Sequence, residues 1–216
     1  MNFFREARRS DDVMEASRAT MLQANLEADR GNLAVARELL RNGILKDRAT
    51  GVDGFAAQKT IALAYLEGIS GNRGSAVAKA RDAVFIRRSP QVLVQAVSIL
   101  ARFGTPEDAA ALMNTVPARE GPKYEADKLR MRGEILLAKG NFKDAVDLLT
   151  RAAQLDRPEE PKEYLARALD MAGDRQGARL IYQRIVDTSF LTWITDEEQP
   201  ATRFRAMEYL KTTKGE

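Results

Sequence analysis

The sequence contains no cysteine and no histidine, and aromatic residues make up only 6% of its 216 residues. Without cysteine, the chain has no disulfide and no thiolate chemistry. Because histidine is missing as well, the common zinc and copper sites and histidine-based acid–base catalysis are excluded. The scarcity of aromatic residues, together with many alanines, favours closely packed helices over a β-sandwich.

Long apolar runs are also missing. No stretch approaches the roughly 18 uninterrupted apolar residues that span a bilayer, so we expect no membrane insertion. Charged residues follow Phe3 and Phe4 at once, so the start of the chain lacks an apolar core of signal-peptide length. We therefore expect a cytoplasmic protein, with an exported or periplasmic location as the alternative if a signal segment has been removed.

The motifs of nucleotide, metal and sugar chemistry are absent from the sequence. It has no glycine-rich phosphate loop and no EF-hand spacing of acidic residues. Its net charge of +3 is spread among acids, and the basic stretches "REARRS" and "FIRRSP" are short, so nucleic acid is not an expected partner. We predict no catalytic residue, no cofactor and no metal ion, and hence a protein that is not an enzyme.

What the sequence does contain is one short pattern, present five times. The five segments are "GNLAVARELL", "GNRGSAVAKA", "GTPEDAAALM", "GNFKDAVDLL" and "GDRQGARLIY", which begin at Gly31, Gly71, Gly104, Gly140 and Gly173. Successive glycines are 40, 33, 36 and 33 residues apart, and a period of about 34 residues is typical of helix–turn–helix repeats. Apolar residues at helical spacing precede and follow each glycine.

The pattern has a physical explanation. A helix ends readily where glycine adopts a left-handed conformation, and a polar residue after it can cap the next helix. These polar residues are Asn32, Asn72, Thr105, Asn141 and Asp174. Small residues five positions after each glycine would let two helices approach closely. They are Ala36, Ala76, Ala109, Ala145 and Ala178. Short residues seven positions before each glycine would face them. These are Ala24, Ala64, Val97, Gly133 and Ala166.

The pattern resembles that of tetratricopeptide repeats, most closely in the fourth unit with Gly133, "GN" at 140–141, Ala145, Leu149 and Pro158. The resemblance implies an all-α fold, a right-handed superhelical array of about five helical hairpins over residues 12–188. Its units would span about 12–48, 52–89, 90–119, 122–157 and 159–188. Residues 1–11 would form an N-terminal extension or the start of the first helix. The first two units depart from the family pattern, because Glu27 and Glu67 stand where an apolar or aromatic residue is usual.

Residues 189–216 follow the array with an apolar cluster that includes Trp193, and then with an amphipathic segment. Because a solenoid needs a terminal element with one apolar face, we expect a C-terminal capping helix over 199–212. Trp193 would lie beneath that helix, or it would be an exposed contact residue for a partner.

The resemblance implies binding rather than catalysis: a bacterial-type scaffold or adaptor that holds a peptide or a partner helix in its concave groove. The alternative is a regulatory or sensory segment of a larger protein, such as a transcription regulator. Homo-oligomerisation stays open. Helix phase assigns the following partner-binding residues to the groove: Asn25, Gln91, Val94, Ser98, Arg130, Glu134, Leu137, Glu163 and Arg167.

Overall fold

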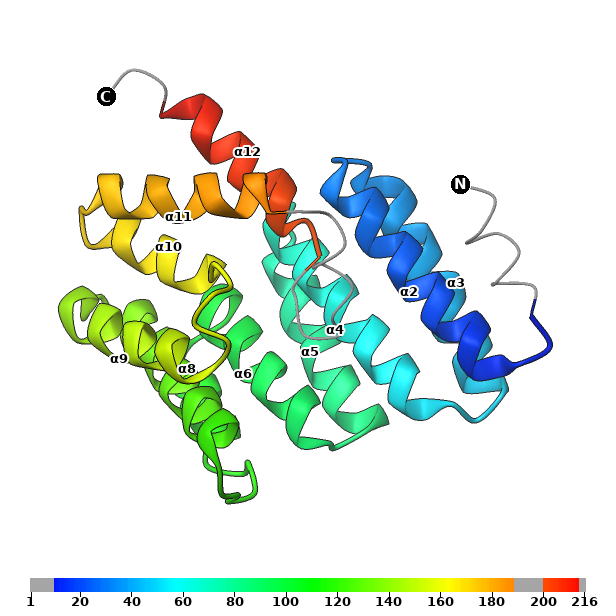
Figure 1. Cartoon of the computed structure of the whole chain (residues 1–216). Coiled ribbons are helices and arrows are strands. Elements are labelled where there is room, and N and C mark those ends of the chain that lie inside the picture. Colours follow the sequence, from blue (N-terminus) through cyan, green and yellow to red (C-terminus); the bar gives the residue numbers. More distant parts are fainter. Residues whose placement is uncertain (1–9, 189–199, 214–216) are drawn as a thin grey trace.

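The computed structural model describes residues 10–188 and 200–213. Within these ranges the chain forms eleven α-helices and no strand (Figure 1), which confirms the predicted all-α class for this part of the chain. The helices are α2 (Val13–Asp29), α3 (Leu33–Ala49), α4 (Asp53–Ile69), α5 (Arg73–Ile86), α6 (Pro90–Phe103), α7 (Pro106–Met113), α8 (Pro122–Ala138), α9 (Phe142–Leu155), α10 (Glu163–Met171), α11 (Arg175–Asp187) and α12 (Thr202–Thr212).

The helices pack mainly against their neighbours in the sequence. The pairs α2/α3, α4/α5, α6/α7, α8/α9 and α10/α11 are each in contact, and successive pairs contact one another. Figure 1 shows them following one another from the blue α2/α3 pair to the orange α11. Residues 1–9 and the expected apolar cluster around Trp193 lie outside the described residues.

Four of the five turn glycines end their helices in the way the sequence predicts. Gly31, Gly71, Gly140 and Gly173 have φ between 79° and 89°, the left-handed region. In each case the next residue's N–H donates to a carbonyl five residues back, as Asn32 does to Glu27, which is the Schellman end of a helix. Gly104 differs, because its φ is −105°. A β-carbon there would lie 2.9 Å from the Leu100 carbonyl oxygen, so close backbone approach is what favours glycine at this position.

The capping prediction holds for only two of the five polar residues after these glycines. The side chains of Thr105 and Asp174 accept backbone N–H groups of α7 and α11, whereas the asparagines at positions 32, 72 and 141 make no capping hydrogen bond. Two of them bond backwards instead. Asn32 Nδ2 donates to Glu27 Oε2 at 2.7 Å, and Asn72 Nδ2 donates to Glu67 Oε2 at 2.9 Å. The two unexpected glutamates therefore fix the turns that follow them.

The small residues predicted between paired helices are buried. The alanines five positions after each glycine are 0% exposed. Opposite Ala145, a β-carbon on Gly133 would lie 2.6 Å from Leu149 Cγ, so α8 and α9 approach too closely for a larger residue. These positions supply the contacts of several core clusters, in which Ala36, Ala76, Ala109 and Ala178 each take part.

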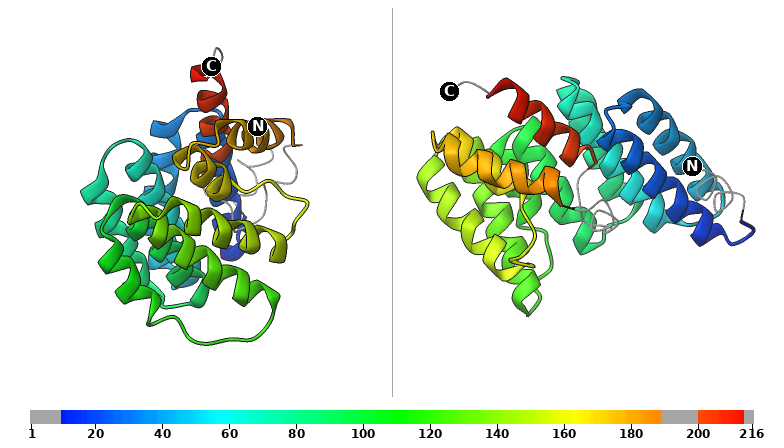
Figure 2. Two further views of the ribbon diagram at one scale, coloured as in Figure 1. Left: turned by 90° about the vertical axis from the view of Figure 1, so that its left-hand side faces the viewer. Right: turned by 45° about the horizontal axis from the view of Figure 1, so that its top comes forward.

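The C-terminal helix α12 contacts both ends of the described helix series. On one side it packs on α11, where the Tyr209 and Tyr182 ring centroids are 4.4 Å apart. On the other side Arg203 N donates to Asp29 Oδ1 at 3.2 Å, and the Phe204 ring occupies the space beside Gly31. Figure 2 shows α12 beside α11 from two further directions. The expected terminal helix is present, and it also joins the last pair to the first.

Candidate ligand pocket

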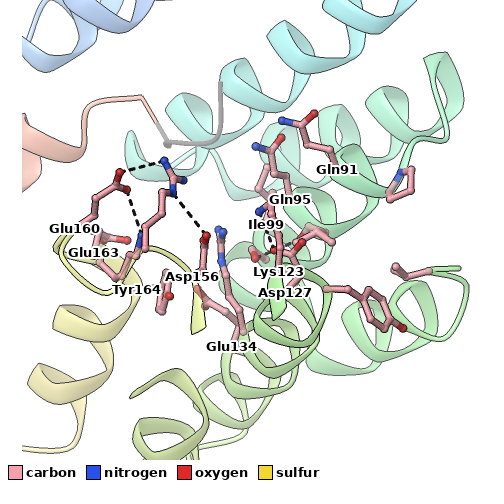
Figure 3. Close-up of a pocket in the computed structure, with 18 of the residues that line it drawn as sticks. Gln91, Gln95, Ile99, Lys123, Asp127, Glu134, Asp156, Glu160, Glu163 and Tyr164 are labelled. Carbon is pink, nitrogen blue, oxygen red and sulfur yellow. Dashed lines mark hydrogen bonds and ion pairs between the residues drawn. The ribbon is translucent and has the colours of Figure 1, made fainter. Parts of the chain in front are cut away.

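A cavity of about 540 Å³ lies where α4, α6, α8, α10 and α12 meet. Two helices supply its longest walls, α6 from Gln91 to Arg102 and α8 from Lys123 to Glu134 (Figure 3). Residues spaced three or four apart lie on the same face of a helix. On α6 this spacing brings Gln91, Val94, Gln95 and Ser98 to the cavity. The wall is completed by Tyr65 of α4, Thr202 of α12, the segments 116–120 and 156–162, and the start of α10.

Six of the nine residues that helix phase assigned to a groove line this cavity. They are Gln91, Val94, Ser98, Arg130, Glu134 and Glu163. The other three do not line it. Asn25 lies on α2, Leu137 is buried in a cluster with Ala145 and Leu149, and the guanidinium of Arg167 is bonded to Glu134. Phase places a side chain on a helix face, but it does not show how far a neighbouring helix covers that face.

Three residues that line the cavity, Tyr65, Arg102 and Glu163, belong to a network of charged and phenolic groups that Arg205 completes. Arg205 of α12 donates to Glu163 and, at 2.6 Å, to the Tyr65 hydroxyl. Arg102 Nη1 lies 3.2 Å from the Tyr65 hydroxyl and 3.5 Å from Glu163 Oε1. Burial alone would raise the pKa of Glu163, but Arg205, Arg102 and Arg167 outweigh it and lower that pKa from 4.5 to about 2. Glu163 is therefore ionised, and its network joins α4, α6, α10 and α12.

Most of the other charges around the cavity are paired as well. Arg167 donates to the buried Glu134. In the 156–162 segment, Arg157 lies 3.2 Å from Glu160 and 3.6 Å from Asp156, and Lys162 Nζ lies 3.3 Å from Glu160. On α8 the Lys123 and Asp127 side chains are 3.7 Å apart. These charges are therefore already paired before any ligand binds.

Arg130 is the exception among the charged groups inside the cavity. Its guanidinium carbon lies 5.1 Å from the centroid of the Tyr164 ring. Its Nε is buried and has no hydrogen-bond acceptor, and no described carboxylate forms an ion pair with it. Burial raises the pKa of the Tyr164 hydroxyl well above its ordinary value, so this ring stays neutral beneath the cation. Arg130 is therefore held beside Tyr164, but its buried Nε–H lacks a hydrogen-bond acceptor.

Sequence reasoning missed four residues that line the cavity, Tyr65, Arg102, Tyr164 and Thr202, and also Arg205, which is bonded to the lining residues Tyr65 and Glu163. Arg102 follows Ser98 by one helical turn, so its place on the same face could have been found from spacing. Arg205 could not, because it meets Tyr65 across 140 positions of sequence. That contact depends on where α12 packs.

Neither a metal-binding cluster nor a membrane-spanning helix occurs among the described residues. Among residues 10–188 and 200–213, no group of three or more acidic, cysteine or histidine side chains could hold a metal ion. No helix in these ranges is long and apolar enough to cross a bilayer. No protein-family model matches the chain, and no curated protein sequence matches it.

Proposed function

We propose that the protein is a non-catalytic binding module of the tetratricopeptide type, an adaptor that holds a segment of a partner protein in the pocket between α6 and α8. A right-handed superhelix of hairpins, a bacterial origin and a cytoplasmic location belong to the same proposal. The paired helices, the glycine turns and the alanine contacts support the repeat assignment. The pocket supports the binding role.

One observation carries this proposal, the pocket itself. Its volume of about 540 Å³ lies within the roughly 300–1,000 Å³ of ligand sites in proteins. Glutamines, serine and tyrosines line it together with Val94 and Ile99, and such a mixture of apolar contact and hydrogen-bonding groups suits the backbone and side chains of a peptide. Because Thr202 of α12 lines the site, the segment held is short and not a peptide that crosses all five helix pairs.

The test is selection of peptides from a displayed random library, followed by affinity measurements with a variant whose pocket is filled. Gln91 lines the pocket, so Gln91→Trp places a large ring inside it. Gln176 is exposed on α11 and does not line the pocket, so Gln176→Trp is the matched control. We expect selected peptides to bind Gln91→Trp at least about tenfold more weakly and Gln176→Trp as tightly as the unmodified protein. Equal binding to all three proteins would refute the pocket as the binding site.

A further inference from the structure

Equal numbers of cationic and acidic side chains line the pocket, six of each, but their pairing is unequal. Every lining acid except the exposed Glu120 has a cation within ion-pair distance. Of the lining cations, only Arg119 and Arg130 form no ion pair with a described carboxylate. Arg119 is exposed at the rim, where water can solvate it. Arg130 is half-buried within the wall.

We infer that the pocket selects a segment carrying a carboxylate, which Arg130 receives. This inference rests on the proposed function and names the chemistry that the site recognises. A ligand that fills the cavity removes the water around the guanidinium, and a charge taken out of water must be paired. Glu134 is already bonded to Arg167, so it is not free to serve. The missing acceptor must therefore come from the ligand.

The placement of Arg130 favours a carboxylate over a neutral acceptor. Its guanidinium carbon lies over the Tyr164 ring, 5.1 Å from the centroid, and a guanidinium is planar and presents two parallel donors that match the two oxygens of a carboxylate. Gln95 and Ser98 on the facing helix α6 offer further polar groups within the same cavity. A lysine would keep the positive charge but lose the planar fork of donors.

Two sources can supply the carboxylate, an acidic side chain or the free C-terminus of the partner. Peptides selected on the protein are therefore synthesised in matched forms: with Asp or Glu, with Asn or Gln in its place, and with a free or an amidated C-terminus. Each is titrated against the unmodified protein, Arg130→Met, Arg130→Lys and Arg132→Met. Arg132 is exposed on α8 and does not line the pocket, which makes it the control.

The expected result is a coupling between one peptide carboxylate and Arg130. Replacing that carboxylate by an amide, or Arg130 by Met, weakens binding about thirtyfold or more, and combining both changes adds little. Arg130→Lys has an intermediate effect, and Arg132→Met has none. The form of peptide that shows the coupling identifies the source of the acid.

Failure of this inference differs from failure of the proposed function. Peptides that Gln91→Trp rejects, but that bind equally as acid and amide, would overturn the inference and leave the binding module standing. The inference also fails if Arg130→Met weakens acid and amide forms equally, because Arg130 would then only support Tyr164. If no selected peptide depends on the pocket, both proposals fail.

Discussion

Two groups of charged side chains lie inside the protein, one between α2, α3 and α4 and the other around the pocket. In the first, Lys59 is 0% exposed, and its Nζ lies 2.6 Å from Asp47 Oδ2 and 2.5 Å from Ser17 Oγ. The ammonium also lies 5.3 Å from the Phe55 ring centroid. The Lys59 charge is therefore paired within the protein, with two hydrogen bonds and a ring contact.

The pocket differs because it is accessible and its hydrogen bonding is incomplete. Glu163, Tyr65, Arg102 and Arg205 satisfy one another, but Arg130 keeps a buried Nε without an acceptor. A buried pair with no remaining donor holds helices together and has nothing left for a ligand. A cation in a cavity with an unused donor can form a hydrogen bond to a ligand. Charge that supports the fold thus differs from charge available for recognition in whether its donors are already used.

Breaking the enclosed pair should have the largest effect. Asp47→Ala leaves the Lys59 ammonium buried without its counter-charge, which costs about 3–5 kcal/mol of unfolding free energy. Urea denaturation measures this loss. The matched control is Asp108→Ala, which removes an exposed ion pair with Arg81 and should cost about 0–1 kcal/mol. Similar losses for the two variants would show that the Lys59 cluster is hydrated and not enclosed.

A smaller loss is expected when the pocket network is broken. Arg205→Met removes donors to Glu163 and Tyr65 and should lower the unfolding free energy by about 1–3 kcal/mol, because Arg102 still serves both groups. The loss should be local, so hydrogen exchange should quicken in α12 before it does in α4 or α6. Lys211→Met, on the exposed face of α12, is the control. Uniformly faster exchange would mean that α12 does not open independently.

The same division between local and distant contacts explains what the sequence could predict. The glycine turns and buried alanines follow from neighbours within one helix pair, so spacing was enough to find them. The asparagine caps were wrong at positions 32 and 72, where each Nδ2 donates back to the preceding glutamate and the side chain accepts no N–H from the helix that follows.

Distant contacts left no periodic signal. A lysine in "AAQKTIALAYL" gives no sign of being fully buried, since its partners Asp47 and Ser17 come from two other helices. Gly43 leaves room for the buried Lys59 side chain, because a β-carbon there would lie 2.8 Å from Lys59 Cδ. Likewise, the closed pocket depends on α12 meeting α4, so an extended groove was the natural expectation from a repeat pattern alone.

The smallest effect concerns the pH dependence of stability, in which two acids that contact the first turn of α12, Asp29 and Glu163, behave oppositely. Burial raises the pKa of Asp29, which accepts the Arg203 N–H, from 3.8 to about 6, although Arg203 opposes the shift. A raised folded-state pKa stabilises the docked helix below the unfolded value and loses that contribution as pH rises through about 6. Glu163 behaves oppositely: its pKa of about 2 gives stability above 4.5 that is lost as pH falls toward 2.

The docking of α12 should therefore be strongest at about pH 4, between the ordinary pKa values of 3.8 for Asp29 and 4.5 for Glu163. Asp29→Asn imitates the protonated acid and keeps an oxygen for the Arg203 N–H. At about pH 7.5 this variant should be more stable than the unmodified protein by about 1–2 kcal/mol, and the difference should shrink at about pH 5. Urea unfolding at both pH values measures this, with the exposed Asp82→Asn as control. A gain that does not change with pH would mean that Asp29 is charged in the docked helix across this range, and that its carboxylate is hydrated where it meets α12.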